Sequence, residues 1–199
     1  MQTSILAIHA GERPNGNSYA LLEQARKGAE EAGAKVEILV VREKNFAPCV
    51  SCGGCAASGD CAVKDDMTDI YRLLRKADHI IVATPIYFRS LPGRFKCLID
   101  RCQAFWQAKY VLNQRVAANP SGVRRLGAFL ACCGSPKGET MFPPAEKIIS
   151  AFFNCLDVEL RYKLYVPGTD TIGAVLKQPD VIEKARQIGR SLAEAKSTA

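Results

Sequence analysis

Five short apolar runs alternate with longer segments of helical periodicity along the chain, and this alternation constrains the fold more than any other feature. The runs are predicted to be strands, at residues 5–8, 36–41, 80–83, 126–133 and 158–166. Each is followed by a segment in which apolar residues recur at i, i+3 or i+4, and i+7, as on one face of an amphipathic helix. Because strands that alternate with helices form a mostly parallel sheet, the sequence predicts an α/β fold.

The composition of each run predicts its place in the sheet. The first four runs are almost continuously apolar, which is typical of parallel strands covered by helices on both faces. The fifth alternates apolar and polar residues from Val158 to Val166, which is typical of a half-exposed edge strand. We therefore expect a doubly wound five-stranded parallel sheet in the order 2-1-3-4-5, with helices on both faces and ligands at the carboxyl ends of its strands.

The overall composition indicates one domain over residues 1–199. The chain is 48% hydrophobic and 24% charged, which is ordinary for a globular protein. It starts without a basic segment and has no apolar stretch of the roughly 18 residues that a membrane span needs, so we expect a cytoplasmic protein. The formal charge of +7 suits an anionic cofactor, an acidic protein or nucleic acid, but the scattered Lys and Arg residues argue against nucleic acid.

Four cysteines within thirteen residues form the most specific motif of the chain. Cys49, Cys52, Cys55 and Cys61 follow the spacing C-x2-C-x2-C-x5-C in a glycine-rich stretch after the second run. Three cysteines at consecutive +3 steps with a fourth nearby fit a [4Fe-4S] cluster better than structural zinc, whose two C-x2-C pairs usually lie further apart. We expect a compact cluster loop at residues 47–62, with zinc binding and free thiols as the alternatives.

The loop after the first run has the features of a phosphate-binding loop. Residues 10–18 lead directly into a helix, for which Asn17 or Ser18 is the expected N-cap. Gly11 and Gly16 let backbone N–H groups turn toward an anion at the helix N-terminus. A Walker A loop would have Lys at position 17, and no G-x-G-x-x-G occurs, so we expect neither an NTPase nor a Rossmann dinucleotide site. An ordinary strand–helix turn is the alternative.

Two further loops at strand ends suit a flat aromatic ligand. The third run continues into residues 84–93, which combine aromatic rings, prolines that stiffen the backbone, and polar donors. The fourth run ends in the flexible polar loop 132–138. Because the carboxyl ends of parallel strands meet at one edge of the sheet, these loops and the phosphate loop together describe a mononucleotide site.

Several polar residues near the strand ends are predicted to have structural roles. Asp66 with Asp69 has the spacing of a capping box at the start of a helix, and such carboxylates are better suited to capping than to metal binding. His9 and His79 lie at a strand end and a strand start without a visible partner, so both are predicted to be structural or surface residues.

These segments together resemble the NAD(P)H-dependent FMN reductase group of flavodoxin-like proteins, and in particular its iron-sulfur flavoproteins. GERPNGNS is similar to the phosphate loop S-P-R-x-x-G-N-T/S of the group, and TPIYFRSLPGRFKCLIDR to its T-P-I-Y-F-G-S region beside the flavin ring. The cysteine motif followed by DDM is similar to the cluster motif of the iron-sulfur branch. The chain departs from the pattern at Gly11, where the family usually has a phosphate-binding Ser, and at Arg89, where it usually has Gly.

The resemblance implies a flavodoxin-like fold that binds FMN and carries a [4Fe-4S] cluster on the four cysteines of the motif. The residues expected around FMN are Gly11, Arg13, Asn15, Asn17 and Ser18 at the phosphate, and Pro85, Ile86, Tyr87, Phe88, Cys133, Gly134 and Ser135 at the isoalloxazine ring. No particular catalytic residue is expected, because electron transfer between the two cofactors requires no side chain to move a proton.

We therefore expect an oxidoreductase that passes electrons from NAD(P)H, as a transient co-substrate, or from ferredoxin to a small oxidant or quinone. The net charge of +7 favours an acidic electron-transfer protein such as ferredoxin as a partner. The resemblance implies a homo-oligomer, either a dimer or a tetramer. Residues 103–125 are the expected contact between copies, with a helix extension or a lid as the alternatives. The alternatives are an electron carrier without its own substrate and a cluster-free FMN reductase with redox-active thiols.

Overall fold

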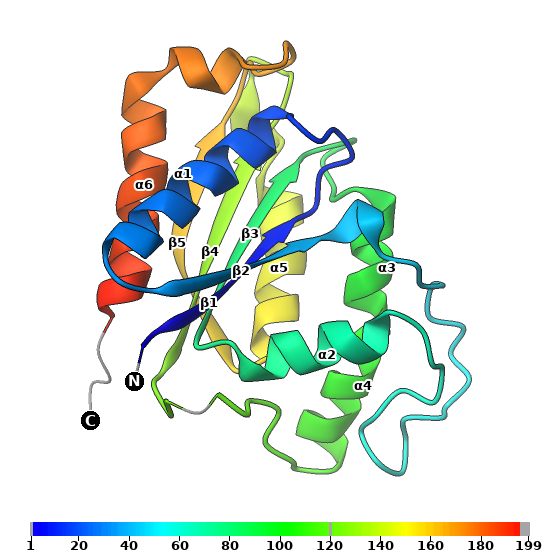
Figure 1. Ribbon diagram of the computed structural model, residues 1–199. Helices are drawn as coiled ribbons and strands as arrows, with labels where there is room; N and C mark the ends of the chain where they lie inside the picture. The colour runs from blue at the N-terminus through cyan, green and yellow to red at the C-terminus, as the bar shows by residue number, and fades with distance from the viewer. Residues whose placement is uncertain (1, 120, 196–199) are drawn as a thin grey trace.

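The strands of the computed structural model, which describes residues 2–119 and 121–195, are hydrogen-bonded in the order β2-β1-β3-β4-β5 (Figure 1). All four strand pairs are parallel. The strands are β1 (Ser4–His9), β2 (Lys35–Val40), β3 (His79–Pro85), β4 (Arg125–Cys132) and β5 (Val158–Val166). The predicted α/β class, the parallel sheet and the strand order are therefore confirmed.

Helices connect successive strands and cover both faces of the sheet (Figure 1). One face is covered by α1 (Asn17–Glu31) and α6 (Pro179–Glu194), and the other by α2 (Met67–Lys76), α3 (Gly93–Arg101) and α5 (Pro143–Cys155). A short helix α4 (Gln103–Trp106) and a π-helical turn η2 (Gln107–Val111) extend α3. Three 3₁₀ turns complete the described helical structure, namely η1 (Val41–Glu43), η3 (Gly138–Thr140) and η4 (Ala174–Lys177).

Each face of the sheet has its own hydrophobic core. The core under α2, α3 and α5 contains fully buried aromatic side chains, among them Phe95, Phe129 and Phe153. The core under α1 and α6 consists of smaller, mostly aliphatic side chains. These two helices also approach each other closely. A Cβ atom on Gly28 would collide with the carbonyl oxygen of Arg186 on the facing helix, so only glycine fits there.

The two edge strands differ in how well their exposure was predicted. β5 is half-exposed, as its alternating sequence predicts. The prediction that β2 is covered on both faces is wrong, because most of its residues are exposed or half-buried and Ile38 is 37% exposed. The exposure of β2 is that of an edge strand, since β2 lies at the end of the sheet and pairs only with β1 within the described sheet.

The start of α2 is also built differently from the prediction. Asp66 occupies the N-cap position, but its side chain makes no capping hydrogen bond and instead accepts one from the backbone N–H of Asn45 (2.8 Å). The carboxylate of Asp65 accepts the hydrogen bond of the Met67 N–H (3.0 Å). The predicted capping box of Asp66 with Asp69 is therefore wrong, and the carboxylate one position earlier satisfies a free N–H group of the first turn.

The cysteine loop packs against the helical extension that follows α3. Residues 44–66 contain no helix or strand, and Figure 1 shows them beside α2 and α4. A Cβ atom on Gly59 would lie 2.6 Å from that of Ala108 in η2, so the loop backbone lies directly on this turn.

Residue 120 of the predicted contact segment 103–125 lies outside the described residues, as do residues 1 and 196–199 of the predicted domain. In the described part of the chain, none of the helices combines the length and apolar character needed to span a membrane.

Candidate flavin site and cysteine cavity

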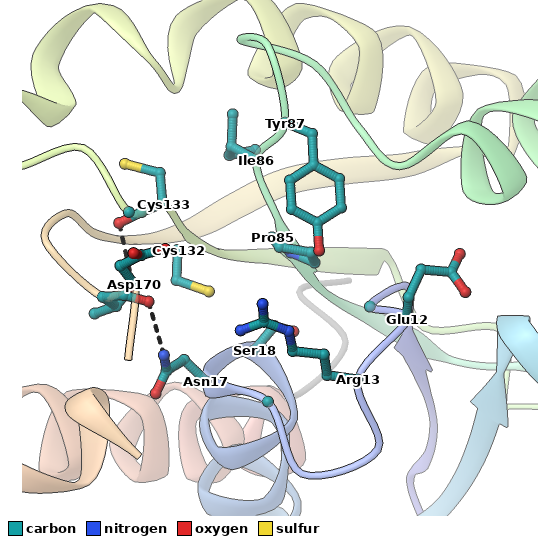
Figure 2. A pocket seen from close by; sticks show the side chains of 14 residues that line it. Glu12, Arg13, Asn17, Ser18, Pro85, Ile86, Tyr87, Cys132, Cys133 and Asp170 are labelled. Atoms are coloured by element: carbon teal, nitrogen blue, oxygen red, sulfur yellow. Dashed lines mark hydrogen bonds between the residues drawn. The ribbon is translucent and has the colours of Figure 1, made fainter. Parts of the chain in front are cut away.

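A cavity opens at the carboxyl ends of β1, β3 and β4, where this strand order predicts a ligand (Figure 2). Its walls are the loop after β1, the end of β3, the end of β4 and the loop after β5. The lining residues are Gly11, Glu12, Arg13, Gly16, Asn17, Ser18, Pro85, Ile86, Tyr87, Cys132, Cys133, Gly134, Thr169 and Asp170. In Figure 2, Arg13 and Ser18 approach the cavity from the α1 side, opposite Cys133 and Ile86.

The structure brings together nine of the twelve residues predicted around FMN. The other three, Asn15, Phe88 and Ser135, do not line the cavity, and the Phe88 side chain is fully exposed. Sequence reasoning missed Thr169 and Asp170, which follow β5 and reach back over the cavity. Their position just beyond the carboxyl end of a parallel strand is the signal that could have found them.

Asn17 fastens the loop after β5 to the start of α1. Its side-chain nitrogen donates hydrogen bonds to the carbonyl oxygens of Thr169 and Thr171, both at 2.8 Å. Its side-chain oxygen accepts a hydrogen bond from the N–H of Val175 (3.2 Å). The helix N-cap is Gly16 and has no side-chain cap, so the prediction of Asn17 or Ser18 as N-cap is wrong. The side-chain amide of Asn17 is engaged in these three bonds. The backbone N–H of Asn17 is therefore the group of this residue that is free to bind a phosphate.

A buried hydrogen-bond donor lies beside the phosphate loop. A Cβ atom on Gly11 would lie 2.8 Å from Oγ of Ser18 and 2.9 Å from Nε2 of His9. These two side chains therefore flank position 11, where the family usually has a Ser. His9 is fully buried, and burial together with the charge of Arg42 lowers its pKa to about 4.

The contacts of the His9 ring assign its proton. Nη1 of Arg42 lies 3.1 Å from Nδ1 of His9, and a guanidinium can only donate, so the neutral ring carries its proton on Nε2. Nε2 has no partner within the described structure. A buried donor without a partner is costly, and a phosphate oxygen above Gly11 would satisfy it, so the loop fits the phosphate of FMN.

The loop after β3 closes in a tight turn beside the cavity. Tyr87 and Ser90 exchange two backbone hydrogen bonds, of 3.0 and 2.8 Å. Between them, Phe88 and Arg89 have φ angles of 49° and 61°, the left-handed conformation that type I′ turns require. This explains why Gly is usual at position 89, and Arg there costs on the order of 1 kcal/mol in backbone strain. The turn leaves Tyr87 at the cavity and points Phe88 into solvent.

A second cavity, of about 230 Å³, lies between the cysteine loop and the end of α3. All four cysteines of the motif line it, and all four are free thiols. Burial raises the pKa of the Cys55 thiol, and the charges of Cys61, Cys49 and Cys52 raise it further. The four sulfurs are therefore close enough to influence one another around a common space.

The two predicted metal-bound alternatives differ in how closely the thiols must approach one point. Within residues 2–119 and 121–195, no group of three or more His, Cys, Asp or Glu side chains is placed to hold a single metal ion. A zinc ion needs all its thiolates within about 2.3 Å of one point, whereas a four-iron cluster binds each thiolate at a different corner. In the described structure the four thiols line a shared cavity, and this lining is compatible with either ligand set.

Cys61 lies beside the buried Arg101 in this cavity. Burial alone would raise the pKa of its thiol, but hydrogen bonds from the Val63 backbone and from the Arg101 side chain, together with the Arg101 charge, lower it. The thiolate is the form of cysteine that binds metal, so this environment favours ligand chemistry at Cys61.

The strand order, with a cavity at the carboxyl ends of the adjacent strands β1 and β3, where the strand order reverses, defines the flavodoxin-like class of α/β proteins. Residues 3–139 match the family model described as NADPH-dependent FMN reductase. The chain therefore belongs to the NADPH-dependent FMN reductase family, as its motifs predict.

Curated relatives agree with the iron-sulfur flavoprotein branch of this family. The "Iron-sulfur flavoprotein" of Methanosarcina thermophila is 32% identical over 57% of this chain and 60% of its own length. "Iron-sulfur flavoprotein MJ1083" of Methanocaldococcus jannaschii is 32% identical over 62% of this chain and 64% of its own. The chain thus spans somewhat less than two thirds of the length of these relatives.

Solved structures agree on the fold over the whole chain. An NAD(P)H:quinone oxidoreductase from Methanothermobacter marburgensis superposes with a TM-score of 0.74 at 17% identity, covering 100% of both chains. A flavone reductase superposes with a TM-score of 0.72 at 21% identity, covering 97% of this chain and 62% of its own. At these identities the likeness establishes a shared flavodoxin-like fold.

Proposed function

We propose that the protein is an oxidoreductase that binds FMN in the strand-end cavity and a [4Fe-4S] cluster on Cys49, Cys52, Cys55 and Cys61. The observation that carries the proposal is that four free thiols line one cavity in a chain of the FMN reductase family. When bound, FMN exchanges electrons in pairs and the cluster exchanges them singly, so together they connect a two-electron reaction with a one-electron partner.

The two cavities lie at opposite ends of α3. The loop before this helix contributes Tyr87 to the flavin cavity, and its last residue, Arg101, lines the cysteine cavity. A helix of nine residues is about 13 Å long, so one rigid element sets the spacing of the two sites. This spacing supports electron transfer within one chain.

The proposed flavin contacts follow from the charges and shapes of the lining residues. The phosphate lies at the N-terminus of α1, where free backbone N–H groups, Arg13, Ser18 and Nε2 of His9 are the donors. Tyr87 and Cys133 exclude water at the ring. Burial raises the pKa of the Cys133 thiol, so it stays neutral near pH 7 and acts as an apolar wall.

The electron acceptor and the oligomer complete the proposal. The acceptor is a small oxidant or quinone, which accords with structural neighbours named for quinone and flavone.

The contact between copies in a homo-oligomer is the apolar surface formed by Trp106, Tyr110 and Val111, which are each between 42% and 49% exposed. Sedimentation of the wild type against Trp106→Ser tests this contact, since a smaller oligomer is expected from the variant.

Iron, sulfide and flavin analysis of an anaerobic preparation tests the proposal most directly. About four irons, four sulfides and one FMN per chain, with a broad visible charge-transfer band, are expected for a [4Fe-4S] flavoprotein. Zinc or free thiols give no such band. A preparation with FMN but without iron would leave the cluster-free FMN reductase, and one with both cofactors but no turnover would leave the electron carrier.

Arg13→Ala is expected to weaken FMN binding by about 1.5–3 kcal/mol, or roughly 10- to 150-fold, because it removes a charge-assisted hydrogen bond to the phosphate. Flavin fluorescence titration of the apoprotein measures the dissociation constant. Riboflavin lacks the phosphate, so its binding should be the same in variant and wild type. Arg72→Ala, an exposed arginine paired with Asp69 on α2, serves as the control. An unchanged FMN dissociation constant in Arg13→Ala would remove Arg13 from the site.

Reduced ferredoxin is expected to reduce the flavin at least as fast as NAD(P)H. The net charge of +7 attracts an acidic protein. Arg89 is exposed in the turn that follows the cavity residue Tyr87, where the family usually has Gly, and its longer side chain is expected to narrow the approach of a nicotinamide. Stopped-flow flavin reduction with each donor measures the two rates. Raising the salt from about 0.05 to 0.5 M should slow the ferredoxin reaction strongly, because salt screens charge steering.

Arg89→Gly is the matched variant for this comparison. It should speed reduction by NAD(P)H and leave the rate with ferredoxin nearly unchanged, apart from the loss of one charge. Fast reduction by NADPH together with slow, salt-insensitive reduction by ferredoxin would contradict the charge argument. NADPH would then be the better supported electron donor.

A further inference from the structure

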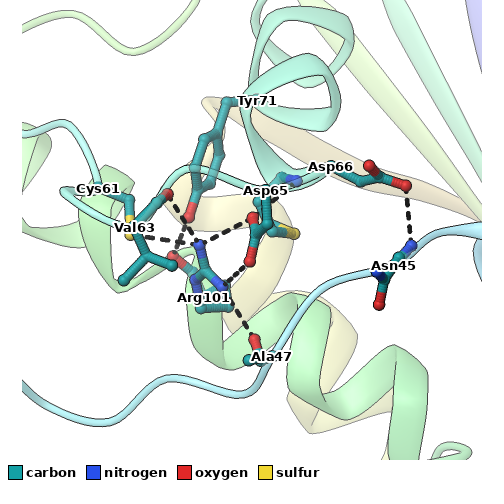
Figure 3. Close-up of polar contacts among 9 residues, drawn as sticks. Asn45, Ala47, Cys61, Val63, Asp65, Asp66, Tyr71 and Arg101 are labelled. Carbon is teal, nitrogen blue, oxygen red and sulfur yellow. Dashed lines mark hydrogen bonds and ion pairs between the residues drawn. The ribbon is translucent and has the colours of Figure 1, made fainter.

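Arg101, the last residue of α3, is buried beneath the cysteine loop and contacts both of its ends (Figure 3). Its side chain is only 2% exposed. Nη1 donates to the carbonyl oxygen of Ala47 (2.9 Å) at the start of the loop, and Nη2 donates to that of Val63 (3.4 Å) at its end. One guanidinium thus joins two points of the backbone that lie sixteen residues apart.

The same guanidinium forms a two-pronged ion pair with Asp65. Nη1 lies 2.7 Å from one carboxylate oxygen and Nη2 lies 3.1 Å from the other. The Asp65 carboxylate also accepts the N–H of Met67 at the start of α2. The Tyr71 hydroxyl, from α2, donates to the Arg101 carbonyl (2.8 Å). The pair is therefore fixed to both α2 and α3, which are elements of the rigid core.

Arg101 also contacts a predicted cluster ligand. Nη2 lies 3.4 Å from Sγ of Cys61, within hydrogen-bond range of a sulfur acceptor (Figure 3). Reduction adds negative charge to a cluster, and hydrogen bonds to its sulfurs favour the reduced form. A buried guanidinium beside a ligand sulfur has a larger effect than an exposed one, because water screens it less.

We propose that Arg101 is a positioning residue that holds the cysteine loop in its ligand-binding conformation and raises the reduction potential of the cluster. The first role concerns the loop itself and holds with or without iron. The second rests on the proposed function, because it needs a cluster on the four cysteines. Arginine suits both roles, since its planar fork reaches the two carbonyls, the carboxylate and the sulfur at once, which a lysine ammonium cannot do.

The experiment compares Arg101→Lys and Arg101→Met with Lys96→Met as the matched control. Lys96 lies on the same helix and pairs only with the exposed Asp100 among the described contacts. Limited proteolysis of the apoprotein measures opening of residues 47–63. Iron content after anaerobic reconstitution measures cluster retention, and an EPR-monitored redox titration gives the midpoint potential.

Arg101→Met is expected to increase proteolysis within residues 47–63 about tenfold or more, because the loop then opens more often, and to lose most of its iron. Arg101→Lys keeps the charge but loses most of the contacts, so it should retain part of its iron at a lower midpoint potential. Lys96→Met should match the wild type in all three measurements.

Each outcome of the comparison decides a part of the proposal. Wild-type proteolysis, iron content and potential in Arg101→Met would overturn it. If Arg101→Met fails to fold, the same result in Arg101→Lys overturns it equally. If the wild type itself binds no iron, the proposed cluster function fails, and proteolysis of the apoprotein alone still confirms or rejects the loop-holding role.

Discussion

Cys55→Ala is expected to lower bound iron from about four per chain to near zero while FMN stays bound, because a cubane loses its stability when one of four thiolates is removed. Cys55 lies in the middle of the motif and is half-buried, so water cannot easily replace its sulfur without opening the loop. The flavin cavity shares no lining residue with the cysteine cavity, and FMN affinity should therefore be unaffected.

Iron and flavin analysis of anaerobically purified variants measures this effect, with Ala substituted at each of the four positions in turn. Cys97→Ala is the matched control, because Cys97 is also a half-buried free thiol but lies on α3 outside the cysteine cavity. It should keep both cofactors. Full iron in all four single variants would exclude the motif as the ligand set. Loss of zinc rather than iron would identify a structural zinc site instead.

Strand order and the general place of the ligand followed from the sequence because they depend on patterns spread over many residues. Apolar runs of strand length, separated by helical periodicity, admit few topologies, and parallel strands place their carboxyl ends at one edge. The grouping of Arg13, Ser18, Tyr87 and Cys133 around one cavity follows from that topology.

Choices between neighbouring polar residues could not be predicted in the same way. Asp65 and Asp66 are adjacent, and nothing local indicates that the first pairs with Arg101 while the second accepts the N–H of Asn45. Those partners are separated from them by about twenty to thirty-six residues and meet only after the helices pack. The exposure of β2 escaped prediction for another reason: the predicted strand order places it at the sheet edge, but its apolar composition favoured a strand covered on both faces.

The residues after β5 show the same limit at the flavin cavity. Thr169 lines the flavin cavity because the side-chain nitrogen of Asn17 donates a hydrogen bond to its carbonyl oxygen and so holds the loop after β5 in place. The two residues are 152 positions apart in the sequence. Asn17 resembles a phosphate-loop residue by its motif, yet the structure uses its side chain to build the wall of the site. Sequence motifs therefore located the site, while long-range hydrogen bonds decided which atoms face it.

Acidification of the apoprotein from pH 7 to 4.5 is expected to lower its free energy of unfolding by about 5 kcal/mol, chiefly through two buried histidines. His9 and His79 are fully buried, and burial is the main cause that lowers the pKa of each from 6.5 to about 4. The folded state therefore holds both rings neutral where the unfolded chain binds protons. This stabilisation is present above pH 6.5 and is lost as the pH falls toward 4.

Urea unfolding of the apoprotein at several pH values between 7 and 4.5 measures this slope, and His79→Gln isolates one of the two groups. Nδ1 of His79 accepts a hydrogen bond from the Leu126 N–H (3.1 Å), which a Gln carbonyl oxygen can replace without titrating. The variant should lose about half of the pH dependence. A flat free energy over this range, or an equal slope in His79→Gln, would contradict the prediction. The apoprotein is required because a phosphate beside Nε2 of His9 would favour the protonated ring and reduce the contribution of His9.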